Sequence, residues 1–197
     1  MLHGREHHTV ILCKEVIHAM DGKDSRMIKM VIGVYPGIRG GISGLGINED
    51  GKTSAHFSMP VPTAQKQLDT EAIKFIFRLA CESESASHSP SHILVAIEKA
   101  WPPLGSRIIG ASGHCLNAGL IEGIAHGMGI LVTRIAQRDW SAYYMSNLPC
   151  NASIEARRKE WISVAMGLYP EANLKEDDRF SRAESLLIAG YAARSLK

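Results

Sequence analysis

Several features that identify common protein classes are scarce in this sequence. Only four of its 197 residues are cysteines, and no two of them form a CxxC pair. Such isolated cysteines support neither a zinc site nor a disulfide framework, so we expect a reducing, cytoplasmic compartment. Neither sign of charge predominates, since the formal net charge is +2. Any affinity for nucleic acid must therefore come from local clusters of lysine and arginine.

Long apolar runs and internal repeats are also missing. No run approaches about 18 residues, the length that a membrane-spanning helix requires, so no membrane association is expected. The segment "TVILC" near the start is too short for a secretory signal and is followed at once by Lys14 and Glu15. The 45% hydrophobic and 21% charged content is typical of a globular protein, and the length allows one domain with a sizeable core.

Residues 1–26 differ in composition from the rest of the chain. They contain four of the nine histidines and end in a segment rich in Gly, Asp and Ser. His3, His7 and His8 match no metal-binding spacing, which favours a solvated, partly disordered extension over a metal site. We therefore expect one domain over residues 27–197.

Apolar periodicity and turn signals predict alternating strands and helices. The stretch "VIGVYPGIRGG" indicates two strands joined by a turn at Pro36-Gly37. Asp50-Gly51 is a strong hairpin signal, and Asp69 is the expected N-cap of the helix that follows it. Strands are expected near 30–35, 41–48, 52–58, 92–98 and 130–136, and helices near 70–83, 112–129, 138–148, 153–169 and 181–196. This order predicts a three-layer α/β fold with one five-stranded mixed sheet, the first three strands antiparallel and the last two parallel to the first.

Glu98 ends the apolar run "ILVAIE". Strand alternation places Leu94, Ala96 and Glu98 on one face. A charge that closes a buried strand is costly unless it is paired or bound to a metal. A strand-end glutamate that reaches solvent beside Lys99 is an equally good interpretation of this residue alone.

Glu184 strengthens the interpretation of Glu98 as a functional acid. The predicted apolar stripe of "FSRAESLLIAGYAAR" consists of Phe180, Ala183, Leu187 and Tyr191. Glu184 lies beside this stripe, whereas an amphipathic helix normally keeps glutamate on its far face. Asp177 and Asp178 either complement the helix dipole or supply a third member of an acidic cluster. Such carboxylates are the oxygen ligands that magnesium needs.

Basic, aromatic and small residues accompany these carboxylates. Trp101, just beyond Glu98, is either a stacking wedge for DNA bases or a cap on the core. Gly119, Gly123 and Gly127 are spaced by four, which indicates close packing of their helix against the sheet or a partner subunit. The candidate DNA-binding residues are Arg39, Lys99, Trp101, Arg107, Arg138, Arg157, Arg158, Lys159 and Arg182, of which 157–159 form a short basic run.

Five stretches carry a resemblance to a known family. "VIGVYPGIRGGISGL" resembles the first strand and hairpin of RuvC-type Holliday junction resolvases, especially the phage-like branch, whose pattern is Ile-Gly-Ile-Asp-Pro-Gly before a Gly-rich strand. "LVAIEKA" resembles the second motif, a strand ending in a catalytic Glu, and "LVTRIAQRDW" the strand before a Pro-x-x-Trp segment. "GLYPEANL" and "SRAESLLIAGYAAR" are similar to the family's "LFPEANL" and "GRADALLIAEY". The similarity extends in matching order from Met30 to about Arg194.

This resemblance implies a ribonuclease H-like fold, a homodimer, and cleavage of branched or four-way junction DNA with two Mg²⁺ ions (or Mn²⁺ in their place) held by four acidic groups. By the matching motifs, Glu98 is the second-motif acid and Glu184 the last acid, changed from Asp. The family's acid or His one turn earlier falls on Ser181. Asp178 or Asp177 would replace it as a ligand only if the loop folds inward.

Tyr35 stands where the family has its first Asp, the ligand that bridges both metals. A phenol with a pKa near about 10 is neutral at pH 7 and is a poor magnesium ligand. The leading hypothesis is therefore a RuvC-like, structure-selective endonuclease that is impaired by Tyr35. The second is an inactive junction-binding protein with the same fold, and the third a ribonuclease H-like fold used for protein contacts.

Overall fold

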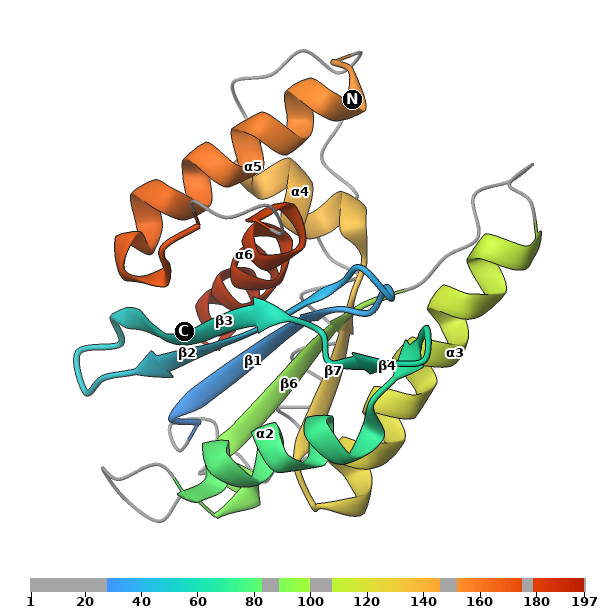
Figure 1. The fold of residues 1–197 in the computed structure, drawn as a ribbon. Coiled ribbons are helices and arrows are strands. Elements are labelled where there is room, and N and C mark those ends of the chain that lie inside the picture. The colour runs from blue at the N-terminus through green and yellow to red at the C-terminus, as the bar shows by residue number, and fades with distance from the viewer. Residues whose placement is uncertain (1–27, 83–88, 100–107, 146–151, 175–178, 197) are drawn as a thin grey trace, which may run out of the picture.

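The computed structural model describes residues 28–82, 89–99, 108–145, 152–174 and 179–196. Its centre is a five-stranded mixed sheet with the strand order β3-β2-β1-β6-β7 (Figure 1). The strands are β1 (Met30–Tyr35), β2 (Gly41–Ile47), β3 (Thr53–Pro60), β6 (Ile93–Glu98) and β7 (Leu131–Ile135). β1 to β3 form an antiparallel meander, and β6 and β7 run parallel to β1. The predicted α/β class, the number of strands and their directions are confirmed.

The β2–β3 hairpin forms where the sequence predicts it. Gly51 has a φ of 73°, a left-handed conformation that glycine adopts without a steric penalty. The side chain of Asn48 accepts a hydrogen bond from the backbone N–H of Lys52 at 2.6 Å. The local chemistry of these residues therefore accounts for the turn.

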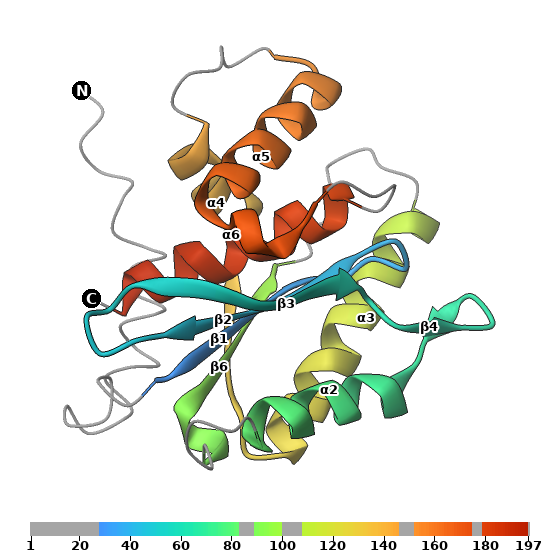
Figure 2. The same cartoon turned by 60° about the vertical axis from the view of Figure 1, so that its left-hand side comes forward.

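One face of the sheet is covered by α2 (Thr70–Glu82) and α3 (Ile108–Gly127) (Figure 1). Asp69 accepts a hydrogen bond from the backbone N–H of Ala72 at 3.0 Å, as expected of an N-cap. Ile73 and Phe77 of α2 belong to one buried cluster with Ile32 of β1. Between β3 and α2, the small hairpin of β4 (Thr63–Ala64) and β5 (Gln67–Leu68) projects from the body (Figure 2). A short 3-10 helix, η2 (Pro90–His92), leads into β6.

The opposite face carries two layers of helix. They comprise α6 (Arg179–Ser195), α4 (Gln137–Tyr144), α5 (Ile154–Leu168) and the 3-10 turn η3 (Pro170–Ala172). α6 lies on the sheet, and α4 and α5 pack over α6 (Figures 1 and 2). Every residue from 181 to 190 is buried. The predicted single apolar stripe on this helix is therefore wrong, because α6 is an internal layer enclosed on both sides.

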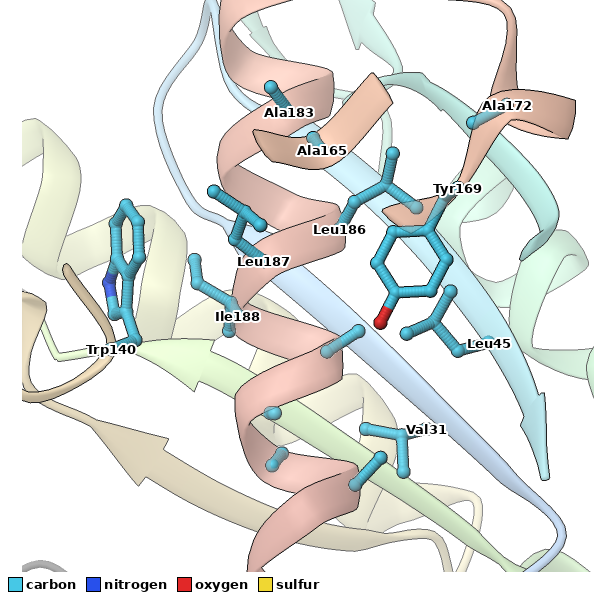
Figure 3. Packing of buried hydrophobic residues seen from close by; sticks show 14 of the residues in the cluster. Val31, Leu45, Trp140, Ala165, Tyr169, Ala172, Ala183, Leu186, Leu187 and Ile188 are labelled. Carbon is cyan, nitrogen blue, oxygen red and sulfur yellow. The ribbon is translucent and has the colours of Figure 1, made fainter. Parts of the chain in front are cut away.

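Packing around α6 combines large and very small residues. Figure 3 shows Leu187 and Ile188 beside Trp140, with Leu186 and Tyr169 on the side of Leu45. At the sheet, the approach is closer still. A Cβ added at Gly33 would lie 2.0 Å from the backbone oxygen of Ser185, and one added at Gly41 would lie 2.1 Å from that of Ser181. Glycine is required at these positions because the helix backbone rests directly on the strands.

A buried polar network connects α6 to β2 and β3. The Ser43 hydroxyl donates to Ser58 at 2.9 Å and lies 2.6 Å from the Ser185 hydroxyl. The single hydroxyl proton of Ser185 is shared between the Ser43 oxygen and the backbone oxygen of Arg182, which is 2.9 Å away. Satisfied buried hydrogen bonds of this kind specify a single arrangement of helix on sheet.

Some predicted features fall on residues that the structure does not describe. The expected extension, residues 1–26, lies outside the described residues, as do Trp101, Arg107, Asp177 and Asp178. Across the described helices, none is long and apolar enough to cross a membrane.

Candidate active site

Two strand ends and one helix bring the predicted acids together. β1 and β6 are parallel and Val34 pairs with Ile97, so Tyr35 and Glu98 end neighbouring strands at the same edge of the sheet. Glu184 is on α6, which crosses this edge, and both carboxylates are buried. Glu98 and Glu184 both act electrostatically on the Tyr35 phenol. The structure therefore places Tyr35, Glu98 and Glu184 in one cluster.

Glu98 is held by a buried tryptophan. The indole Nε1 of Trp140 in α4 donates a hydrogen bond to Glu98 Oε2 at 2.9 Å. Burial raises the pKa of Glu98 to about 7, and the hydrogen bond from Trp140 opposes this rise. The alternative of a carboxylate in solvent beside Lys99 is wrong, since Glu98 is only 6% exposed. The tryptophan of the "LVTRIAQRDW" motif thus fixes the orientation of a candidate ligand.

Glu184 and Tyr35 are also shifted by their surroundings. Burial and the nearby Glu98 raise the pKa of Glu184 to about 8, and Arg158 of α5 opposes the rise. Burial, followed by the charges of Glu184 and Glu98, raises the pKa of Tyr35 to about 12. The phenol is therefore neutral near pH 7 and offers a hydroxyl where the resemblance expects a carboxylate.

His114 of α3 is a neighbour that sequence reasoning missed. Its ring meets the Tyr35 ring edge-on, with centroids 5.2 Å apart. Burial lowers the pKa of His114, which favours the neutral imidazole. The local sequence "SGHC" carries no signal for this role, because only the packing of α3 beside the end of β1 makes the contact.

Two clefts meet at Tyr35 and Glu184 of the cluster. The hairpin-side cleft, of about 710 Å³, is lined by residues of the β1–β2 turn and β3, including Arg39, and by Phe180. The helix-side cleft, of about 510 Å³, is lined by Gln137, Arg138, Ser141, Ile154, Arg157 and Trp161. Tyr35, Arg158 and Glu184 line both clefts. The Arg158 guanidinium also lies over the Phe180 ring, 5.7 Å from its centroid.

The predicted basic residues have different positions. Arg39 lines the hairpin-side cleft, and Arg138, Arg157 and Arg158 line the helix-side cleft. Lys99 and Lys159 are exposed and are not among the described lining residues, and Lys159 pairs with Glu155 at 3.4 Å.

Arg182 points into the protein interior. It is 7% exposed and donates to the backbone oxygen of Ala172 at 2.6 Å. Its guanidinium thus holds η3 against α6.

This donor set fits one divalent cation better than two. Glu98 and Glu184 are buried carboxyl groups whose raised pKa values reflect the cost of ionising them without a counter-charge, a cost that a bound cation would offset. Within the described ranges, no group of three or more His, Cys, Asp or Glu side chains is placed to hold a metal. Two Mg²⁺ ions need more carboxylates than this pair provides.

Comparisons with known proteins identify the fold. Neither a family model nor a curated protein matches the sequence. Among solved structures, T. thermophilus RuvC in complex with Holliday junction substrate matches with a TM-score of 0.58 and 16% identity over 84% of this chain and 95% of that one. A second Thermus thermophilus RuvC structure has a TM-score of 0.51 and 18% identity over the same shares. The yeast mitochondrial Holliday junction resolvase Ydc2 has a TM-score of 0.50 and 14% identity over 93% of this chain and 85% of that one. The chain therefore has the RuvC-like, ribonuclease H-like fold.

Proposed function

We propose that this chain is a structure-selective endodeoxyribonuclease of the RuvC type that binds branched DNA and cleaves it poorly because Tyr35 replaces the first metal-ligating carboxylate. The observation that carries the proposal is the convergence of Tyr35, Glu98 and Glu184 at the ends of β1 and β6. The match to RuvC and Ydc2, which are described as acting on Holliday junctions, supports the choice of substrate. Residues 27–197 would form the nuclease domain and residues 1–26 an extension.

Glu98 and Glu184 are the residues that would hold Mg²⁺, with Mn²⁺ as an alternative. The chemistry that such an ion would supply at these two residues is a lowered pKa of a coordinated water and stabilisation of negative charge on phosphate oxygens. Trp140 restricts Glu98 to one orientation through its hydrogen bond. Tyr35 supplies a neutral hydroxyl near the two acids and no bridging charge. Asp178 stays the proposed third ligand on the basis of its position in the sequence.

The two clefts would accept DNA. Arg39 lines one cleft, Arg138 and Arg157 line the other, and Arg158 lines both, so positive charge is present in both clefts that border Glu184. A strand that crosses this surface would have its phosphates neutralised on either side of the cluster. The basic residues of the clefts and the RuvC-like fold together support branched DNA as the proposed partner.

A homodimer would place two such sites on one junction, since a four-way junction has nearly two-fold symmetry. The proposed interface is α3. A Cβ added at Gly119, Gly123 or Gly127 would meet no atom within 4 Å, so packing against this chain's own sheet does not explain these glycines. They line a groove of about 410 Å³ together with Leu120, and Leu116 on the same helix is 64% exposed.

A second candidate function is a non-catalytic junction-binding protein. It is favoured by the uncharged state of Tyr35 and by the presence of only two carboxylates among the described residues of the cluster. The two candidates share the DNA surface and differ in whether Mg²⁺ produces any cleavage.

The deciding experiment measures cleavage of a four-way junction with Mg²⁺ or Mn²⁺. Tyr35→Asp is expected to raise the rate by orders of magnitude, because it supplies the missing bridging carboxylate and removes the bulky ring. Tyr35→Phe is the matched control and should leave the rate low, while Glu98→Gln added to Tyr35→Asp should abolish the gain. An unmodified protein that already cuts as fast as Tyr35→Asp would reject the role given to Tyr35. Failure to bind junctions in the presence of a chelator would reject both candidates.

A further inference from the structure

The β4–β5 hairpin has an unusual turn. Its antiparallel register leaves Gln65 and Lys66 as a two-residue turn between the strands. The φ angles of these residues are 52° and 64°, and two-residue hairpin turns in which both φ angles are positive strongly prefer Asn-Gly. A long side chain in this left-handed region costs free energy, because its Cβ crowds the following carbonyl oxygen. The turn conformation therefore does not account for these two side chains, whereas a contact outside the chain would.

The base of this hairpin is fixed beside the candidate active site. Val61, just before the hairpin, is buried in the same cluster as the apolar face of α2. Its backbone N–H donates to the oxygen of Gly40 in the β1–β2 turn at 2.9 Å. Across the base, the backbone N–H of Asp69 donates to the oxygen of Pro62 at 3.0 Å. Thr63, the first residue of β4, lines the hairpin-side cleft, so the hairpin stands at the rim of that cleft.

The part of the hairpin that projects from the body (Figure 2) is polar and contains no acid. Residues 63–67 are all exposed, and their side chains are a hydroxyl, a methyl group, two amides and one ammonium group. Among the described residues, Lys66 has no ion-pair partner. Hydroxyl, amide and ammonium groups are those that contact phosphate and sugar oxygens in protein–DNA complexes. The lack of aromatic and large apolar side chains disfavours a hydrophobic protein interface.

The tip of the hairpin lies outside both clefts. Neither Gln65 nor Lys66 is among the described residues that line them. At about 3.3 Å per residue, the turn is roughly 7 Å beyond the rim at Thr63. A strand held in the clefts is contacted by the lining residues, whereas a DNA segment against the tip lies beside that strand. Branched DNA has a second arm in such a position.

We propose that the β4–β5 hairpin is a recognition element that contacts the sugar-phosphate backbone of a second arm of branched DNA. Lys66 would bind a phosphate, and the amide of Gln65 would donate to a neighbouring phosphate or sugar oxygen. This inference rests on the proposed function for the identity of the DNA, and it adds an element that discriminates branched from linear substrates. Because its base is fixed, the hairpin would also hold the arm at a set distance from Glu98 and Glu184.

The test compares binding of a four-way junction and of a linear duplex with the same arm sequence, both in the presence of a chelator. Lys66→Gln should weaken junction binding roughly five- to tenfold at about 0.1 M salt and reduce the salt slope by about 1, because one phosphate contact is lost. The linear duplex should lose less than about twofold, since it has no second arm. Lys52→Gln is the matched control and should leave both affinities unchanged, because Lys52 is an exposed lysine in the β2–β3 hairpin at the other end of β1.

A second variant separates the DNA contact from the stability of the hairpin. Gln65→Asn combined with Lys66→Gly supplies the residues that this turn prefers and removes both long side chains. Its melting temperature should not fall, whereas its junction affinity should fall at least as much as that of Lys66→Gln. Unchanged junction affinity in either variant would overturn the proposal, as would an equal loss of affinity for the junction and the linear duplex.

The outcomes also separate this inference from the proposed function. Equally tight junction binding by the unmodified protein and both variants would reject the hairpin contact and leave the proposed function standing. Junction binding that depends on Lys66, without any cleavage by Tyr35→Asp, would retain the hairpin contact and reject the nuclease in favour of the non-catalytic candidate. An unmodified protein that binds no junction would reject both.

Discussion

The two faces of the sheet use glycine in opposite ways. On the α6 face, Gly33 and Gly41 permit contact between strand and helix backbones, since an added Cβ would lie about 2 Å from a carbonyl oxygen. On the α2–α3 face, Gly119, Gly123 and Gly127 of α3 border open space and an apolar groove. The α6 face also holds the buried serine network and the acidic cluster. The α3 side instead exposes Leu116 and Leu120.

This difference shows that the site is built on the tightly packed face. Glu184 keeps its position because α6 cannot shift on β1 and β2 without breaking backbone contacts. The α2–α3 face contributes one ring, His114, to the cluster and leaves Leu116 and Leu120 exposed on its outer surface. Four predictions test the contrast, from the largest expected effect to the smallest.

Gly33→Ala should destabilise the fold by about 3 kcal/mol or more, because its methyl group would displace α6 from the sheet. Gly123→Ala should raise the unfolding free energy of the monomer by about 0.5–1 kcal/mol, because alanine is the better helix former and has space there. Chemical denaturation of both variants at submicromolar concentration measures the difference. Equal losses would mean that the two faces do not differ in packing.

Stability should fall as pH rises from about 4.5 to about 8. In the folded state the pKa of Glu98 is raised to about 7 and that of Glu184 to about 8. The folded protein therefore keeps protons that the unfolded chain has already lost, and stability falls with pH in this window by a few kcal/mol. Melting temperatures of the unmodified protein and Glu184→Gln, compared over this range, test the claim.

The pH slope should be shallower in Glu184→Gln, and Mg²⁺ should restore stability at the upper end because it binds the ionised pair of the folded state. Glu122→Gln serves as the control on the other face, where Glu122 pairs with Arg134 at the surface. An unchanged slope in Glu184→Gln would contradict the raised pKa of this buried acid.

Trp140→Phe should cost about 1–3 kcal/mol, because it removes the donor to a buried carboxylate. The loss should be greater at pH 8 than at pH 5, since ionised Glu98 depends more on that hydrogen bond. Trp161→Phe is the matched control, as its indole N–H has no acceptor among the described residues. Urea unfolding of the two variants at both pH values decides the point, and equal costs would remove the role of Trp140 in holding Glu98.

Substitutions on the outer surface of α3 are expected to have the smallest effect on the stability of the fold. Replacing Leu116 and Leu120 with lysine should leave the melting temperature nearly unchanged, because both side chains are exposed, while it dissociates the proposed dimer. Leu168→Lys is the control, since Leu168 is 51% exposed on α5. Analytical ultracentrifugation measures both. A monomeric unmodified protein at micromolar concentration would reject the interface.

Local sequence patterns predicted much of the fold. The Asp50-Gly51 hairpin, the Asp69 cap and the five strands depend on short-range chemistry, so the residues themselves were sufficient. The pattern failed at α6, where periodicity predicted a surface helix. A helix that is buried on both sides can contain polar residues when they are hydrogen-bonded, as Ser185 is. In the sequence, such residues give the same amphipathic pattern as a helix with one solvent-exposed face.

The sequence by itself determined that a strand ends at Tyr35, that another ends at Glu98, and that an acid stands in the last helix. Motif order then predicted that these residues meet. Only the tertiary structure decided which side chains hold and surround them, because Trp140, His114 and Arg158 come from three separate helices whose packing depends on long-range shape complementarity. The same is true of the glycines. Gly33 and Gly123 are the same residue type. Only the distance from each glycine to neighbouring atoms shows that Gly33 is required for close packing and that Gly123 borders an open groove.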